Sequence, residues 1–206
     1  MAIAFVSSAS TGGSGTSVVV NRPAGIAVGD LMLASVSCRG NATGITAPAG
    51  WTLIRRDNET THHSAAQYYR HYVSGDAASF TWTLGTNVRH AAGIAAYSDV
   101  SSDQPIDVDA GQTNSTASTT MAGPSLTTNF NDEMLVAFAV SEASGQTITD
   151  PTGYTSRYTV SAGGGANAGC TLSVSDKPFA TAGSTGTISA TQSSSRDSTV
   201  QHIALR

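Results

Sequence analysis

Charged side chains are scarce in this chain of 206 residues, and their scarcity excludes several classes of function. They make up 12% of the chain, the formal net charge is −4, and a single lysine, Lys177, stands among the 10 basic residues. Proteins that bind nucleic acids present a basic patch or stripe. Because the sequence contains no basic run, we expect no nucleic-acid partner.

Long apolar runs are also missing. No window approaches the 18 apolar residues of a membrane-spanning helix, so we expect no membrane partner. The first ten residues, MAIAFVSSAS, lack the positive segment and the apolar stretch of a signal peptide, so no export signal is expected. The two cysteines, Cys38 and Cys170, allow at most one disulfide, and we expect both to be buried free thiols.

Helical periodicity is the third absence. No segment sustains a hydrophobic period of 3.6 residues over three turns. The dominant residues are Ser, Thr, Ala and Gly, with 21 glycines, a composition that suits short strands joined by many turns. The sequence therefore predicts an all-β protein.

What the sequence does contain is an internal repeat. The segment ITAPAGW at Ile45–Trp51 returns as ITDPTGY at Ile148–Tyr154, in the shared frame I-T-x-P-x-G-aromatic. The match extends without a gap when Asp30–Thr52 is placed over Glu133–Thr155, and beyond it the offset drifts by a few residues. We interpret the chain as two related halves.

The halves, 1–105 and 106–206, carry strand signals in the same order, about ten strands in all. The nearly continuous apolar runs Leu31–Val36 and Met134–Val140 favour central strands that are covered on both faces. Two such halves packed face to face would bury these strands. The sequence thus predicts one β-sandwich domain over residues 1–206, of the jelly-roll type.

Each Pro-x-Gly turn of the repeat is followed by an aromatic residue, Trp51 in the first half and Tyr154 in the second. Proline presets φ and glycine supplies a positive φ, as in a type II turn. The aromatic ring could stack on a sugar or could close the end of the core. Its recurrence with the turn favours the structural role.

The segment QYYRHY holds the main candidates for an interface or a ligand site. On an alternating strand Tyr68, Arg70 and Tyr72 share one face. Tyrosine and arginine are enriched at interface hot spots, which makes an oligomer contact or a glycan site a candidate here, and an ordinary half-buried strand is the favoured interpretation. The loop before it carries His62 and His63, which we expect to be solvated and include as candidates.

A polar crossover is expected at Ser101–Thr119, between the halves, and it is rich in aspartate. Loop carboxylates are calcium ligands, which makes Asp103, Asp107 and Asp109 candidates for a calcium site. Their spacing fits no EF-hand frame and lacks its closing glutamate, and aspartate is also a common loop residue. A structural loop is the favoured interpretation.

Catalytic signatures are absent. Sugar hydrolysis needs two carboxylates across a cleft, yet only three glutamates exist, and none forms a recognisable pair. The sequence contains no G-x-S-x-G motif, no zinc-type spacing among its five histidines and no phosphate-binding glycine loop before a helix. We therefore expect no enzymatic activity and no cofactor.

Four segments of the first half carry a family resemblance: GIAVGDLMLASVS, PAGWTLI, YYRHYVSGDAASFTWTL and AAGIAAYSDVSSDQPID. They resemble a widespread β-sandwich family of bacteriophage virion proteins and bacterial surface proteins, and the frame returns more weakly in the second half. The chain departs from this pattern at Ser98-Asp99-Val100, where a glycine often precedes the valine.

The resemblance implies a non-enzymatic virion protein, either a capsid decoration or head-spike protein or a fibre-tip module. Its partners would be other virion proteins, such as the major capsid protein or fibre components. A homotrimer at the virion surface, made in the host cytoplasm, is the corresponding expectation.

The alternative is a carbohydrate-binding or adhesion module of a tail-fibre tip or a bacterial surface protein, with an extracellular location. Its partner would be a host-surface glycan, and its exposed aromatic rings would include Tyr68, Tyr72 or Tyr97. In either case function is expected where the halves differ: in Asn58–Ser64, in Tyr68–Tyr72 and in the aspartate-rich crossover.

Overall fold

The computed structural model describes residues 2–40, 44–59, 62–164 and 168–206, and all its regular elements are β-strands. Twelve strands form two antiparallel sheets of six strands each, which confirms the predicted all-β sandwich. Two of the strands span only two residues, which explains the excess over the expected ten. Across the described residues, no helix could span a membrane.

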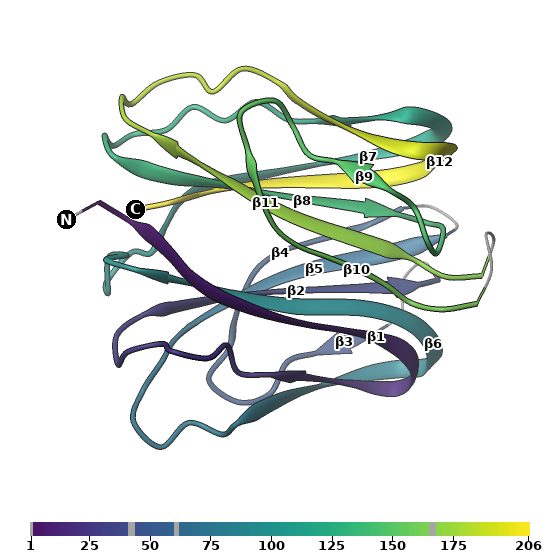
Figure 1. Cartoon of the computed structure of the whole chain (residues 1–206), viewed down its shortest axis with the longest axis horizontal. Helices are drawn as coiled ribbons and strands as arrows, with labels where there is room; N and C mark the ends of the chain where they lie inside the picture. The colour runs from purple at the N-terminus through teal and green to yellow at the C-terminus, as the bar shows by residue number, and fades with distance from the viewer. Residues whose placement is uncertain (1, 41–43, 60–61, 165–167) are drawn as a thin grey trace.

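Each half of the chain forms one sheet (Figure 1). The first sheet has the order β1-β6-β2-β5-β4, with β3 paired to β6, and the second has the order β7-β12-β8-β11-β10, with β9 paired to β12. Each strand of the second sheet therefore holds the place of the strand in the first sheet whose number is lower by six. The strands of the first half are β1 (Ala4–Asn21), β2 (Leu31–Arg39), β3 (Ile45–Thr46), β4 (Thr52–Asn58), β5 (His63–His71) and β6 (Ser79–Ser98). Those of the second half are β7 (Ile106–Gly123), β8 (Glu133–Ser141), β9 (Ile148–Thr149), β10 (Thr155–Ser161), β11 (Thr171–Phe179) and β12 (Ile188–Leu205).

The central core lies between the two sheets. Leu31 and Leu33 of β2 point into it, as do Val136 and Phe138 of β8. The intervening residues, such as Met32, are equally buried but belong to a separate cluster on the outer face of the first sheet. Both central strands are therefore covered on both faces, as their apolar runs predict.

Each half covers the outer face of its own sheet. The second part of β6 pairs with β2, whereas its first part pairs with β3 and the end of β1. This first part places Phe80 and Trp82 against Met32 and Ala34 in the outer cluster. The sequence patterns FTWTL and AAGIAAY indicate separate strands, but they belong to one strand of 20 residues. Its first part lies in the outer layer with β3, and its second part lies beside β2.

The predicted crossover Ser101–Thr119 is largely strand β7. Ile106–Ala110 does alternate apolar and polar residues, a strand signal that the prediction of a crossover overlooked, whereas the small polar residues of 111–117 carry no such pattern. The segment is nonetheless a strand because its backbone pairs with β12 at the edge of the sheet. The first residues of β1 are hidden from sequence analysis for the same reason, and they pair with β6.

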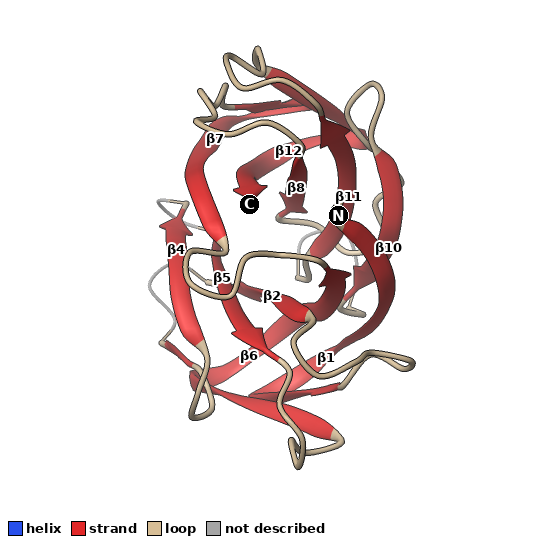
Figure 2. Cartoon of the chain, turned by 90° about the vertical axis from the view of Figure 1, so that its left-hand side faces the viewer, coloured by secondary structure: helices blue, strands red, loops and turns tan. Residues whose placement is uncertain are grey.

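The edges of the sheets approach each other across the halves, β1 beside β10 and β4 beside β7 (Figure 2). At the first of these edges a Cβ atom at Gly12 would clash with the carbonyl oxygen of Ser161, so this approach requires glycine. At the second edge Arg55 of β4 forms a 2.6 Å ion pair with Asp109 of β7. The sandwich is thus closed on both sides.

Buried polar side chains also join the halves. The Gln67 amide donates to Gln201 Oε1 at 2.5 Å, and the Gln201 amide donates to Asp57 Oδ2 at 2.6 Å. The Tyr97 hydroxyl donates to Asp176 Oδ2 at 3.0 Å in a fully buried position. Because unpaired polar groups are costly in a core, these bonds fix one relative placement of the sheets.

Both cysteines are buried and free, as predicted. The Cys170 thiol donates to the carbonyl oxygen of Ser37, with a sulfur–oxygen distance of 3.7 Å. Burial raises the pKa of the Cys170 thiol to about 11 and raises the pKa of Cys38 as well, so both thiols are protonated near neutral pH.

Candidate functional site

The adjacent histidines lie in different environments. His63 is fully buried, and its Nε2 lies 2.8 Å from Thr199 Oγ1. Burial lowers the pKa of His63 to about 4, so this side chain is neutral. The prediction that both histidines are solvated is therefore wrong for His63. The reason is that β5 begins one residue after His62 and carries the next side chain between the sheets.

His62 is the centre of a cluster that sequence analysis did not foresee. Its Nδ1 lies 3.1 Å from Glu142 Oε2, 3.1 Å from Asp197 Oδ2 and 3.4 Å from Glu59 Oε2. Arg39 Nη1 donates to the backbone carbonyl of Glu142 at 2.6 Å and lies 3.4 Å from its carboxylate. The cluster draws on both halves, and no local spacing could have linked these residues.

Metal-ligating atom types meet in this His62 cluster. Donor atoms of Glu59, His62 and Asp197 lie within 4.8 Å of one another, and in the described part of the chain no other group of three such residues does so. Imidazole and carboxylate are ligands of divalent cations. The guanidinium of Arg39 also supplies positive charge here, and the cluster ties β2 and β5 to the second half.

The calcium candidates do not converge. Asp107 accepts hydrogen bonds from the backbone and side-chain nitrogens of Asn129, at 2.7 and 2.9 Å. Asp109 is paired with Arg55, and Asp103 accepts from the Ser102 hydroxyl at 3.3 Å. Asp107 and Asp109 belong to β7, so for these two residues both the candidate calcium loop and the favoured structural loop are wrong.

The QYYRHY candidates are mainly structural. Tyr68 is buried, and its hydroxyl donates to the carbonyl of Ile45 at 3.0 Å, so it offers no exposed ring. Arg70 forms an ion pair with Asp76 and donates to the carbonyl of Ala49 in the first Pro-x-Gly turn. Tyr72 is half-buried beneath a guanidinium.

That guanidinium belongs to Arg22, whose Cζ lies 4.8 Å from the centre of the Tyr72 ring. Tyr97, a further candidate for an exposed aromatic ring, is fully buried and bonded to Asp176. The first half therefore presents none of Tyr68, Tyr72 and Tyr97 as a fully exposed ring.

The aromatic after the first Pro-x-Gly turn is a core residue. Trp51 packs edge-on against both Phe80 and Trp82, with ring centroids 5.1 Å apart in each pair. Tyr68 lies on the other side of Trp82, with centroids 6.3 Å apart. Four aromatic rings thus fill the first corner, in agreement with the structural reading of the turn.

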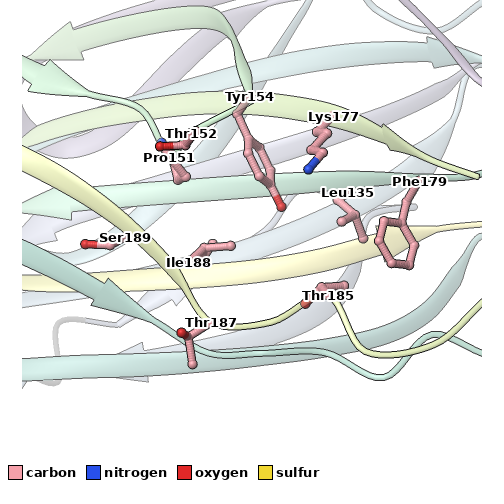
Figure 3. A pocket seen from close by; sticks show the side chains of 10 residues that line it. All are labelled: Leu135, Pro151, Thr152, Tyr154, Lys177, Phe179, Thr185, Thr187, Ile188 and Ser189. Atoms are coloured by element: carbon pink, nitrogen blue, oxygen red, sulfur yellow. The ribbon is translucent and has the colours of Figure 1, made fainter.

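The corresponding corner of the second half is open. Because β3 and β9 hold equivalent positions, the strand registers give the equivalences Ala190 for Trp82, Ile188 for Phe80, Ser175 for Tyr68 and Tyr154 for Trp51. These side chains are smaller, and a pocket of about 260 Å³ lies beside the turn, with Tyr154 and Ile188 of this set in its lining. The lining residues, shown in Figure 3, are Leu135, Pro151, Thr152, Tyr154, Lys177, Phe179, Thr185, Thr187, Ile188 and Ser189.

A buried histidine holds Tyr154 in this pocket. His202 Nδ1 donates to the carbonyl of Pro124 at 3.2 Å, which leaves Nε2 as the acceptor for the Tyr154 hydroxyl at 2.8 Å. Burial lowers the pKa of His202 to about 4 and raises the pKa of Tyr154, so both groups are neutral. The ring is therefore fixed at the pocket wall.

Comparison with protein families, with characterised proteins and with solved structures finds no match to the chain. The geometry of the pocket and of the His62 cluster is therefore the evidence for what each can bind. The pocket is the hollow that combines aromatic, cationic and hydroxyl groups. Its signal in the sequence is the replacement of large aromatic residues by small ones between two otherwise matching halves.

Proposed function

We propose that the chain is a non-enzymatic structural protein of a bacteriophage virion, namely a capsid decoration or head-spike protein. The observation that supports this most is where the family-like segments lie. LMLASVS lies in β2, YYRH lies in β5, and FTWTL and AAGIAAY lie in β6. These three strands are neighbours in the order β6-β2-β5, so the resemblance coincides with the framework of the first sheet.

Two acids that are held in hydrogen-bond networks, Asp176 and Asp57, support a non-enzymatic role. Asp176 accepts two hydrogen bonds from the Arg157 guanidinium, both at 2.7 Å, and a third from Tyr97. Asp57 is engaged in the same way by Arg55 and Gln201. Acids committed to such networks hold the halves together rather than face a substrate.

We further infer that each half is a jelly roll and that the halves arose by duplication. In each half the first and last strands are long, and each can be divided into two segments. With the four strands between them, a half then has eight segments, numbered along the chain. Seven of these segments lie in jelly-roll order. Segments 1, 8, 3 and 6 are neighbours in that order in the inner layer, and segments 2, 7 and 4 are neighbours in the outer layer. Segment 5, strand β4, departs from this order by pairing with segment 6 in the inner layer. The identical strand order of the two sheets supports the duplication.

In this proposal the protein acts by shape. Loops at one end bind the shell, and other loops face outward on a homotrimer at the virion surface. Two exposed apolar side chains, Val28 and Val73, support such a contact because they lie on adjacent loops. The backbone nitrogen of Gly29 donates to the carbonyl of Tyr72 at 2.9 Å and holds these loops side by side.

The experiment is to look for the protein in purified particles of a phage whose genome encodes it. Mass spectrometry of particles banded in a density gradient is expected to find the protein in an integral ratio to the capsid protein. Light scattering of the purified protein is expected to give three copies of the 20.9 kDa chain. Particles that lack the protein, together with a monomer in solution, would contradict the proposal.

The second candidate function is carbohydrate binding or adhesion, at a tail-fibre tip or an extracellular surface. The pocket at the second Pro-x-Gly corner favours it, because sugar sites combine an aromatic wall with hydroxyl and charged groups. A glycan array probed with the labelled protein tests it. Binding of a defined glycan set supports adhesion, and binding to none removes this candidate.

A further inference from the structure

Lys177 is the one charged residue that lines the pocket. In the part of the chain that the structure describes, its ammonium group has neither an ion-pair partner nor a hydrogen-bond partner. An added Cβ at Gly153 would lie 3.6 Å from Nζ, so the ammonium sits over the second Pro-x-Gly turn. A cation in a partly enclosed site, left without an anion, favours an anionic ligand.

In the first half the cation at the corresponding corner has an acidic partner. Arg70 holds the place of Lys177, because Arg70 pairs with Met32 as Lys177 pairs with Leu135. Asp76 from the loop before β6 neutralises Arg70. The corresponding loop of the second half, 180–187, contains no acidic residue. Lys177 at the second corner therefore receives no acidic partner from this loop.

The other groups around the pocket suit a small hydroxylated ring. Figure 3 shows Tyr154 and Lys177 entering from one side and Thr185 and Thr187 from the opposite side. The Tyr154 ring is fixed by His202, so it presents a preorganised apolar face. A volume of about 260 Å³ lies just below the ~300–1,000 Å³ of sites for drug-sized molecules, which fits a single ring.

We propose that this pocket binds one acidic monosaccharide unit, with its carboxylate on Lys177 Nζ and its ring against Tyr154. The Thr187 hydroxyl bonds a hydroxyl group of the sugar. Thr185 Oγ1 already accepts from the Leu126 backbone nitrogen and donates to the Gly186 carbonyl, so it uses its remaining lone pair to accept from a second sugar hydroxyl. This inference rests on the second candidate function, carbohydrate binding, and it names the chemical class of the glycan. It is independent of whether the protein sits on a capsid or on a fibre.

The test is a set of titrations of the full chain, followed by backbone amide NMR and by calorimetry. Glucuronic acid and N-acetylneuraminic acid are the probes, glucose and N-acetylglucosamine are neutral controls, and acetate and inorganic phosphate are simple anions. We expect the acidic sugars to shift the amide signals of Tyr154, Lys177 and Thr185 and to bind about tenfold more tightly than either control class. Equal binding of acidic and neutral sugars would overturn the proposal, and so would acetate or phosphate that binds as tightly as the sugars.

Three variants complete the test. Lys177→Gln removes the charge and is expected to weaken binding of the acidic sugars about tenfold or more, whereas Lys177→Arg is expected to retain most of it. Arg22→Gln removes one positive charge in the first half and is the matched control, with unchanged binding expected. Unchanged binding by Lys177→Gln would overturn the proposal.

The glycan array distinguishes failure of the acidic-sugar proposal from failure of carbohydrate binding, the function on which it rests. Binding restricted to glycans with carboxylated sugars, lost in Lys177→Gln, supports both. Binding restricted to neutral glycans overturns the acidic-sugar inference and leaves carbohydrate binding standing. Absence of binding to every glycan overturns both.

Discussion

Arg70 and Lys177 occupy equivalent places over the two Pro-x-Gly turns, and among the described residues an acid pairs with Arg70 and none with Lys177. A Cβ atom at Gly50 would clash with the Arg70 guanidinium, and one at Gly153 would touch Lys177 Nζ. Asp76 completes the first corner as an ion pair. The two corners thus share a backbone and differ in whether the cation is satisfied internally.

The first prediction concerns Asp76. Burial raises its pKa, but hydrogen bonds from Arg70 and from the Val73 backbone outweigh this effect and lower the pKa below its usual 3.8. A carboxyl with a lowered pKa stabilises the fold above the unfolded pKa, and the contribution is lost as the pH falls through the folded pKa. We expect Asp76→Asn to lower the melting temperature by about 2–4 °C at pH 7 and to have a smaller effect near pH 3. Thermal unfolding at both pH values measures this, and an equal loss at both would contradict it.

The second prediction concerns the buried histidines His63 and His202. Burial lowers the pKa of each from 6.5 to about 4, so the unfolded chain binds more protons than the folded one between these values. Stability is therefore expected to fall as the pH drops from 6.5 to 4, by up to about 3 kcal/mol for each histidine. Urea unfolding across this range measures the slope. In His63→Gln and His202→Gln the slope should be shallower, and a wild-type slope in both variants would refute the assignment.

The third prediction concerns the close approach of β1 to β10. A methyl group at Gly12 would meet the Ser161 carbonyl, whereas one at Gly163 would meet no atom of the described residues within 4 Å. We expect Gly12→Ala to destabilise the fold by about 1–3 kcal/mol, because the edges of the two halves must separate. Gly163→Ala is the matched control and should stay close to wild type. Denaturant unfolding of the two variants decides, and equal stabilities would contradict the packing described.

The fourth prediction concerns the exposed valines. Val28 and Val73 are 67% and 48% exposed, so their replacement by aspartate should leave the fold intact. If their loops contact the shell or a neighbouring copy, the double variant Val28→Asp/Val73→Asp is expected to lose that association at an unchanged melting temperature. Light scattering and particle binding measure the association. A double variant that associates like wild type would place the contact elsewhere.

The sequence predicts much of the framework. The apolar runs identify β2 and β8, because residues buried on both faces leave an unbroken hydrophobic signal. The first part of β1 and most of β7 escape prediction, because their Ser, Thr and Gly side chains carry no alternation. Those strands are held by backbone pairing with β6 and β12, and side-chain patterns do not encode such pairing.

The candidate sites are predicted less well. His62 is rightly singled out as a residue of interest, but its partners Glu142 and Asp197 come from the other half of the chain. Tyr68 has the composition of an interface residue and is in fact core, because its hydroxyl finds a carbonyl partner inside. The pocket beside Tyr154 arises from what the second half lacks, and only the strand registers reveal it.

Co-sedimentation with particles tests the central claim most directly. Purified protein is mixed with particles of an encoding phage from which the gene for this chain has been deleted, and the amount of pelleted protein is measured as its total concentration rises. We expect saturable binding at an integral ratio to the capsid protein, with loss of binding in Val28→Asp/Val73→Asp. Protein that stays in the supernatant at every concentration would contradict it.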